Sequence, residues 1–348
     1  MVITRGHDEM FGMVHDIKAW NIRNMMLYLL SYGNMTKMDM MQLTGLSTTT
    51  VSDTINALMQ LGVLSAVGTQ KSTGGRQAVL YGIHDDYGAF LGITLEPDAL
   101  HMALCNMRSE PLDQETISIV DGDLLQTLYA VIERTLLSVN MPPLIAIGLG
   151  VSGRVAFEQG IVLEGFDIHW HNVPIKEILE RKFGIMTFVD NLSYVGAVYQ
   201  QVLGHAKSLE SALCYFSRIP QRAALIMDGR ICRGARDSCM TISDGVLTGS
   251  TMQGIMEMLG ITKALTDVTH LFDLPCVQPI ATPAFYFEIS SALYAQIKWF
   301  EQLYAIHATP SAPRRKTPST AIKEDEHEPA YQYATLLPHD VDCQPAAQ

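Results

Sequence analysis

The sequence lacks any apolar run long enough to cross a bilayer. Its longest apolar runs, such as LIAIGLGV from Leu144, have the length of a strand, whereas a membrane helix needs about 20 apolar residues. The opening residues MVITRGHDEM contain no apolar segment behind a basic start, which argues against a secretory signal. We therefore expect a cytoplasmic protein that makes no contact with a membrane.

Cysteine is sparse and follows no pattern. The six cysteines form no C-x-x-C pair, and none lies near histidines at the spacing of zinc ligands. This distribution argues against a disulfide framework and against a zinc site. We expect reduced thiols, no metal and no cofactor.

Basic residues are outnumbered, because 24 Lys and Arg face 36 Asp and Glu and the net charge is −12. The excess of acid is uneven along the chain. Residues 1–84 carry six basic and five acidic residues, residues 85–305 carry 14 and 25, and residues 306–348 carry four and six. Only the first segment is not repelled by a polyanion, so nucleic acid could be bound there and not by the acidic remainder.

Composition divides the chain into three regions, which we take as domain boundaries. Residues 1–84 are rich in helix signals. Residues 85–305 alternate short β-rich runs with helical patterns, which is typical of a mixed α/β domain. Residues 306–348 contain much proline, serine, threonine and charge, and cannot bury a core, so we expect a disordered tail.

The first region predicts three helices. The first, Asp16–Leu30, is predicted from the apolar residues Ile17, Trp20, Met25, Leu27, Tyr28 and Leu30. Thr36 followed by Asp39 fits a capping box, and this second helix is expected to reach about Leu43. Gly45 suits the left-handed turn that closes it, and Ser47 is a good N-cap for the third.

Two short helices joined by a glycine-containing turn are the signature of a helix-turn-helix, whose second helix inserts its N-terminal end into the major groove of DNA. One face of this helix is apolar and the other carries hydroxyls and an amide. Asparagine can read adenine, and serine or threonine can contact base edges or phosphate. The residues predicted to contact DNA here are Thr36, Lys37, Ser47, Thr48, Thr49, Ser52, Asp53 and Asn56.

A β-hairpin is predicted to follow these helices. Val63–Val67 and Ala78–Ile83 are expected to pair around a polar loop that contains Lys71 and Arg76. Cations at the tip of such a hairpin are the mark of a wing, which contacts phosphate or the minor groove. The alternative is a helical cap and hairpin that serve only for packing.

In their order along the chain, several segments resemble the ROK family, which comprises repressors, open reading frames and kinases. They are TKMDMMQLTGLSTTTVSDTINALMQLGVL, STGGRQAVLYGI, GLGVSGRV, VDN and DGRICRGA. The resemblance runs from about Asp16 to Asp244 and is to the repressor branch, which includes the xylose and N-acetylglucosamine repressors. It implies a winged helix-turn-helix followed by an actin-like, sugar-kinase-like α/β domain. It also implies a homodimer or higher oligomer and a sugar or sugar-phosphate effector.

Three departures from the kinases of this family argue against an enzyme. In the first phosphate turn, Pro97 removes an N–H donor and Glu96 repels phosphate. The second phosphate turn reads FSRIPQRAAL and contains no glycine. The position of the catalytic base is occupied by Leu192, which cannot accept a proton. We therefore expect no catalytic residues and no ATP-dependent kinase activity.

The sugar and zinc motifs of the family are altered as well. Thr241 and Asp244 replace a glutamate and a histidine, and no cysteine cluster follows, so no metal is predicted. Only Asn191 stands as the resemblance implies for a sugar pocket, while His169 could add a polar contact. The effector-binding candidates are Ser152, Asp190 and Asn191. Their alternative interpretation is that they are ordinary turn residues, and that His169 is a surface histidine.

Together these patterns predict a sequence-specific DNA-binding transcriptional regulator that dimerises on double-stranded operator DNA. The family resemblance favours a repressor. Its second region would form the dimer and sense a sugar-type effector. Two alternatives remain open: a sugar kinase that kept a regulatory domain, and an interaction protein whose degenerate domain binds a protein partner instead of a sugar.

Overall fold

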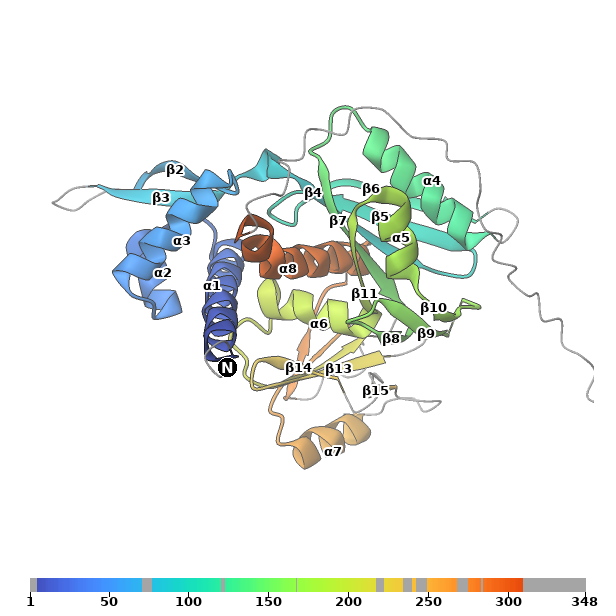
Figure 1. Cartoon of the computed structure of the whole chain (residues 1–348). Coiled ribbons are helices and arrows are strands. Elements are labelled where there is room, and N and C mark those ends of the chain that lie inside the picture. Colours follow the sequence, from blue (N-terminus) through green and yellow to red (C-terminus); the bar gives the residue numbers. More distant parts are fainter. Residues whose placement is uncertain are drawn as a thin grey trace, which may run out of the picture. The chain divides into compact units, whose positions relative to one another are not determined.

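The computed structural model describes residues 5–70, 77–119, 123–166, 168–216, 222–233, 240–241, 249–267, 275–282 and 284–308 (Figure 1). The predicted tail lies outside these residues, apart from the end of the last helix, which runs to Ala308. No helix in the described ranges is long and apolar enough to cross a membrane.

The N-terminal region forms helices and a small sheet. The helices are α1 (Arg5–Tyr32), α2 (Lys37–Thr44) and α3 (Thr48–Gln60). The sheet has the order β1-β3-β2, from Met35–Thr36, Ala78–Ile83 and Leu64–Gln70. The predicted pairing of the last two strands is confirmed, since β2 and β3 are antiparallel, although β2 continues to Gln70.

Local capping signals set the ends of α2 and α3 as predicted. Thr36 and Asp39 form the reciprocal capping box, and Gly45 closes α2 with φ of 69°. This left-handed conformation is costly for residues with a Cβ, which explains the glycine. Ser47 then caps α3 by accepting the N–H of Thr50.

The first helix differs from its prediction in length and in its buried face. It begins at Arg5, well before Asp16. Its buried stripe consists of Ile22, Met25, Met26 and Leu29, which recur at helical spacing. The predicted apolar residues Ile17 and Trp20 are 57% and 56% exposed. Which apolar residues of α1 are buried thus depends on the elements that pack against the helix, and not on hydrophobicity alone.

The second region begins with a five-stranded mixed sheet in the order β11-β7-β4-β5-β6. Its strands are Met186–Asn191, Leu144–Val151, Ala89–Leu95, Ala99–Cys105 and Pro111–Ser118. β4, β5 and β6 form an antiparallel meander, while β7 and β11 run parallel to β4. Strands β4 and β7 are buried along most of their length because helices cover both faces of the sheet.

One face of this sheet packs against α4 (Leu124–Leu137) and α5 (Ile175–Phe183), and the other against α8 (Tyr286–Ala308). The approach of α8 is very close. A Cβ at Gly92 would overlap the carbonyl of Glu288, and one at Gly148 would overlap that of Ser291. Glycine at these two strand positions lets the helix lie directly on the backbone of the sheet.

A three-stranded sheet, β10-β9-β8, follows from His171–Val173, Ile161–Gly165 and Gly153–Ala156. The last sheet has the order β14-β13-β12-β16-β17, with β15 beside β13. Its strands are Arg230–Cys232, Arg222–Met227, Ala212–Phe216, Ala264–Thr266, Val277–Pro279 and Met240–Thr241. Helix α6 (Leu192–Val202) lies between this sheet and α8. Helix α7 (Gly249–Leu259) packs through Met256 against apolar residues of the sheet that include Leu213 and Tyr215.

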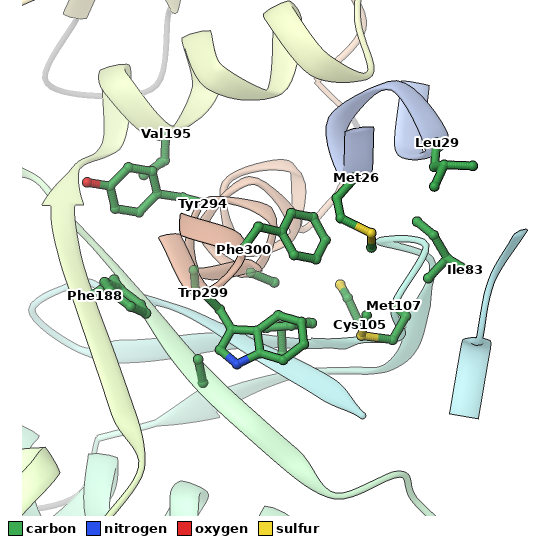
Figure 2. Packing of buried hydrophobic residues seen from close by; sticks show 14 of the residues in the cluster. Met26, Leu29, Ile83, Cys105, Met107, Phe188, Val195, Tyr294, Trp299 and Phe300 are labelled. Carbon is green, nitrogen blue, oxygen red and sulfur yellow. The ribbon is translucent and has the colours of Figure 1, made fainter. Parts of the chain in front are cut away.

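Figure 2 shows the cluster that joins these parts. Trp299 and Phe300 of α8 lie among residues from α1, β3 and β5, including Met26, Ile83 and Cys105. The mixed α/β character predicted for residues 85–305 is confirmed. Helix α8, which organises this core, was not predicted.

Candidate functional site

The outward face of α3 carries short polar side chains. Thr48, Thr49, Asp53 and Asn56 are exposed, and Ser52 is half-buried. The opposite face packs into the N-terminal core. Residues three and four apart share one face of a helix, so the exposed side chains form a continuous stripe.

Some hydroxyls of this stripe already have partners. Ser52 donates to the carbonyl of Thr48, and the Thr48 hydroxyl lies 3.5 Å from the sulfur of Met41. Ser47 is engaged as the cap of α3. Toward other described residues, the Asn56 side chain forms no hydrogen bond. Its amide can therefore both donate and accept toward an external group.

The structure assigns Thr36 a different role from the predicted one. Its side chain is 2% exposed and its hydroxyl is bonded to Asp39 at 2.7 Å. This side chain therefore caps the start of α2, and its contact with DNA stays a prediction. Neighbouring Lys37, at the first position of α2, is half-buried.

The hairpin projects its strand residues toward solvent. From Ala66 to Gln70, every residue of β2 is exposed, and the register of the pair shifts between Ala66 and Gly68. Thr69 donates to Gln77 at 2.9 Å across the pair. The predicted wing cations, Lys71 and Arg76, lie outside the described residues.

Cations are scarce on the two short helices. α3 contains no Lys or Arg, and α2 contains only Lys37. A DNA-facing surface built from α3 would therefore offer hydrogen bonds and methyl groups, and attraction to phosphate would come from neighbouring segments.

The predicted effector residues come together at one edge of the five-stranded sheet. β7 and β11 are parallel, with Asp190 opposite Gly150 and Asn191 opposite Val151. Ser152 follows directly in the chain. Ser152, Asp190 and Asn191 are 5%, 0% and 1% exposed.

The decisive partner of Asp190 was not predicted. Arg233, which follows β14 in the other large sheet, places its guanidinium on this carboxylate. Nη1 lies 3.0 Å from Oδ1, and Nη2 contacts Oδ2. Burial alone would lower the pKa of Arg233, but its hydrogen bond to Asp190 and the charge of that residue raise it above its usual value.

Asn191 also serves the fold. Its Nδ2 donates to the carbonyl of Gly153 at 2.5 Å, and its Oδ1 accepts the N–H of Ser193 at 2.8 Å as the N-cap of α6. His169, which was predicted to add a polar contact, is exposed, unlike the three buried candidates. Of the two altered family positions, Thr241 lies in β15 and Asp244 lies outside the described residues.

Two residues that depart from the kinase motifs, Glu96 and Leu192, contact other parts of the protein. Glu96, in the turn between β4 and β5, lies 3.2 Å from the ring of His101. Leu192 begins α6 and packs beside Gly150. A leucine there places apolar atoms where a general base would need a carboxylate.

Residues 90–238 match the model of the ROK family. This matched segment resembles a ROK family domain and covers less than half of the chain. The match begins in β4 and includes Asp190 and Arg233. We refer below to residues 85–305, the predicted second region, as the ROK region.

Several curated relatives are named as repressors or transcriptional regulators. A xylose repressor of Caldicellulosiruptor bescii is 30% identical over 200 residues, covering 56% of this chain and 50% of the relative. The Bacillus subtilis xylose repressor is 23% identical over 262 residues, covering 72% and 67%. The Escherichia coli transcriptional dual regulator NagC is 23% identical over 236 residues, covering 66% and 58%. The chain spans only about half the length of the Caldicellulosiruptor relatives that it matches, 50% and 57%.

Solved structures establish the fold of the ROK region. A ROK family transcriptional regulator, a homologue of the E. coli MLC protein, matches with a TM-score of 0.66 and 15% identity, covering 84% of this chain and 98% of that one. A ROK glucokinase from Streptomyces griseus matches with a TM-score of 0.50 and 11% identity, covering 60% and 99%. The ROK region therefore has the α/β fold that sugar kinases share.

Proposed function

We propose that this protein is a sequence-specific DNA-binding transcriptional repressor. Residues 1–84 would form a winged helix-turn-helix, and residues 85–305 a ROK domain for oligomerisation and effector sensing. The observation that carries the proposal is the exposed polar face of α3 beside the β2–β3 hairpin. The names of the repressor relatives support it.

The exposed face of α3 favours A·T base pairs. Asn56 can bond adenine through N6 and N7, and the methyl group of Thr49 can contact the methyl group of thymine. Guanine is most often read by arginine or lysine, and α3 has neither. We expect the base pairs that face α3 to be mainly A·T. The one exception is a cytosine opposite Asp53, whose carboxylate can accept a hydrogen bond from the cytosine amino group.

Affinity would come largely from outside α3. Lys37 and the predicted wing cations Lys71 and Arg76 would meet phosphates, while the ROK region is acidic. Few phosphate contacts imply a modest salt dependence for a single copy. A homodimer would double these contacts and read two half-sites about one helical turn apart, or a multiple of that.

The ROK region would regulate and not catalyse. Leu192 and the glycine-free second phosphate turn support the absence of kinase activity. A second candidate function is a regulator whose ROK region binds a protein. The internal bonding of Asp190 and Asn191 favours this candidate, because those side chains are occupied without a sugar.

The test is selection of fragmented genomic DNA by the purified full chain at near-physiological salt, followed by sequencing. We expect a shared inverted repeat with A·T-rich half-sites. No enrichment over bulk DNA would contradict the proposal. Enrichment that disappears when a co-purifying protein is present, with no response to sugars, would favour the second candidate.

A further inference from the structure

Arg233 joins two separate sheets at a buried point. It follows β14 of the last sheet, whereas Asp190 ends β11 of the five-stranded sheet, and the two residues are 43 positions apart (Figure 1). The Arg233 side chain is 20% exposed and that of Asp190 is 1% exposed. The carboxylate is thus sealed from water, where a charged group is stable only with a well-aligned partner, while the guanidinium keeps partial access to solvent.

Aromatic rings enclose the guanidinium. Its central carbon lies 3.7 Å from the ring centroid of Phe157 and 4.8 Å from that of Tyr194. Phe157 follows β8 and Tyr194 lies on α6, so together with Asp190 of β11 the group is held from three separate parts of the fold. Tyr294 of α8 is a further neighbour, and Figure 2 shows its hydroxyl directed away from Phe300. Burial first, and then the charge of Asp190, raise the pKa of Tyr294 well above its usual value.

These surroundings would also suit a small neutral polyol. A guanidinium gives two parallel N–H donors to a carboxylate and offers a flat face to aromatic rings. Two adjacent hydroxyls of a sugar can likewise donate to both carboxylate oxygens, and its C–H face can lie on an aromatic ring. Arg233 therefore occupies the carboxylate of Asp190 and the neighbouring aromatic rings, which are the groups that such a ligand would contact.

We propose that Arg233 is an internal occupant of this site, which keeps neutral sugars out while its guanidinium is bound to Asp190. The inference deepens the proposed effector role of the ROK region and rests on it. It assigns to Arg233 the control over whether the site is open. A sugar binds only when that side chain withdraws, so the ordinary state of the protein is the sugar-free one.

Calorimetric titration of the full chain with D-xylose, D-glucose and N-acetyl-D-glucosamine tests this proposal. We expect no saturable binding by the wild type up to about 10 mM, and at least a roughly tenfold tighter affinity for one of these sugars in Arg233→Ala. The matched control is Arg134→Ala. Arg134 also contacts a carboxylate with two nitrogens, but its partner Glu115 is exposed and neither residue reaches Asp190.

Two results would overturn the inference. One is a wild type that binds a sugar and loses it on Arg233→Ala, which would make Arg233 a ligand contact. The other is a folded Arg233→Ala protein that binds none of the three sugars. If that variant fails to fold, Arg233→Lys keeps the charge, removes the paired donors, and is judged by the same two criteria.

Selection of genomic DNA by the same wild-type preparation separates the two proposals. Absence of DNA enrichment would contradict the repressor function whatever the sugar titrations show. Enrichment together with either overturning result would leave the repressor function standing and remove only the role of Arg233.

Discussion

The guanidinium of Arg23 on α1 donates a hydrogen bond to the carboxylate of Glu301 on α8, with Nε and Oε1 2.9 Å apart. Lys298 contacts the other oxygen of the same carboxylate at 2.9 Å. The first helix of the chain is thus tied to the helix that lies on the five-stranded sheet.

This ion pair should contribute little energy of its own. The side chains of Arg23 and Glu301 are 32% and 35% exposed, so solvent weakens their attraction. A double-mutant cycle with alanine at both positions should give a coupling of about 0.2–1 kcal/mol in urea unfolding, smaller at high salt. The exposed pair Arg181 and Glu177, 3.9 Å apart, is the control and should give less. Equal couplings would contradict a special role for the first pair.

Asn56→Ala should relax base preference without loss of stability. The Asn56 side chain is exposed, so its removal leaves the core unchanged. Loss of a bidentate contact to adenine costs about 1–3 kcal/mol at one position of the site. Affinity for operator variants at each position would be compared with the wild type, and an unchanged profile would exclude Asn56 from base reading.

Thr36→Ala is the contrast to that variant. It removes the capping hydroxyl of α2 and should lower the free energy of unfolding by about 1 kcal/mol. Because the side chain is buried, its loss should leave the order of preferred bases as it was. A changed order with unchanged stability would support a contact between Thr36 and DNA.

Arg76→Ala should weaken binding to all DNA sequences alike. A wing cation meets phosphate or the minor groove, so its loss removes an interaction that carries little sequence information. The slope of log affinity against log salt should fall by about one for each copy bound. Equal affinity of wild type and variant across a salt series would show that residue 76 does not contact DNA.

Gly92→Ala should be strongly destabilising, because the added Cβ meets the carbonyl of Glu288 in α8. Separating the helix from the sheet costs more than the roughly 1–3 kcal/mol of ordinary overpacking. Gly254→Ala is the matched control, since nothing lies within 4 Å of its Cβ position in α7. There alanine should add up to about 1 kcal/mol through helix propensity. Urea unfolding of both variants would test this, and similar losses would contradict the close approach.

Stability should fall at alkaline pH. Burial raises the pKa of the Cys105 and Cys214 thiols from 9.0 to about 12. The folded state therefore holds these protons more tightly than the unfolded state, and the stabilisation is complete below pH 9 and lost as pH rises toward 12. Each thiol can contribute a slope of up to roughly 1.4 kcal/mol per pH unit in that interval.

Urea unfolding between about pH 8 and pH 10 measures this slope. Cys105→Ala and Cys214→Ala should each reduce it, whatever they do to stability at neutral pH. Val51→Ala also removes buried atoms but no ionisable group, so it should lower stability without changing the slope. A slope that is the same in all four proteins would show that the two thiols do not govern it.

Features that depend on neighbours in the chain were predicted well. The capping box of Thr36 and Asp39, the turn at Gly45 and the cap at Ser47 all involve contacts within four residues, so their residue types specify them directly. The mixed α/β character of residues 85–305 was predicted for the same reason, because the spacing of apolar residues in a helix or a strand is a local property of the chain.

Contacts between distant parts of the chain were not visible in the residues. Asp190 was singled out, but nothing near it pointed to Arg233, and the pairing exists only because two sheets bring their edges together. Likewise Ile17 and Trp20 are as hydrophobic as Met25 and Met26, yet only the methionines face α8. Local chemistry fixed where elements begin, end and expose polar groups, while packing chose which apolar and charged side chains meet, because burial energy depends on partners that the chain supplies from far away.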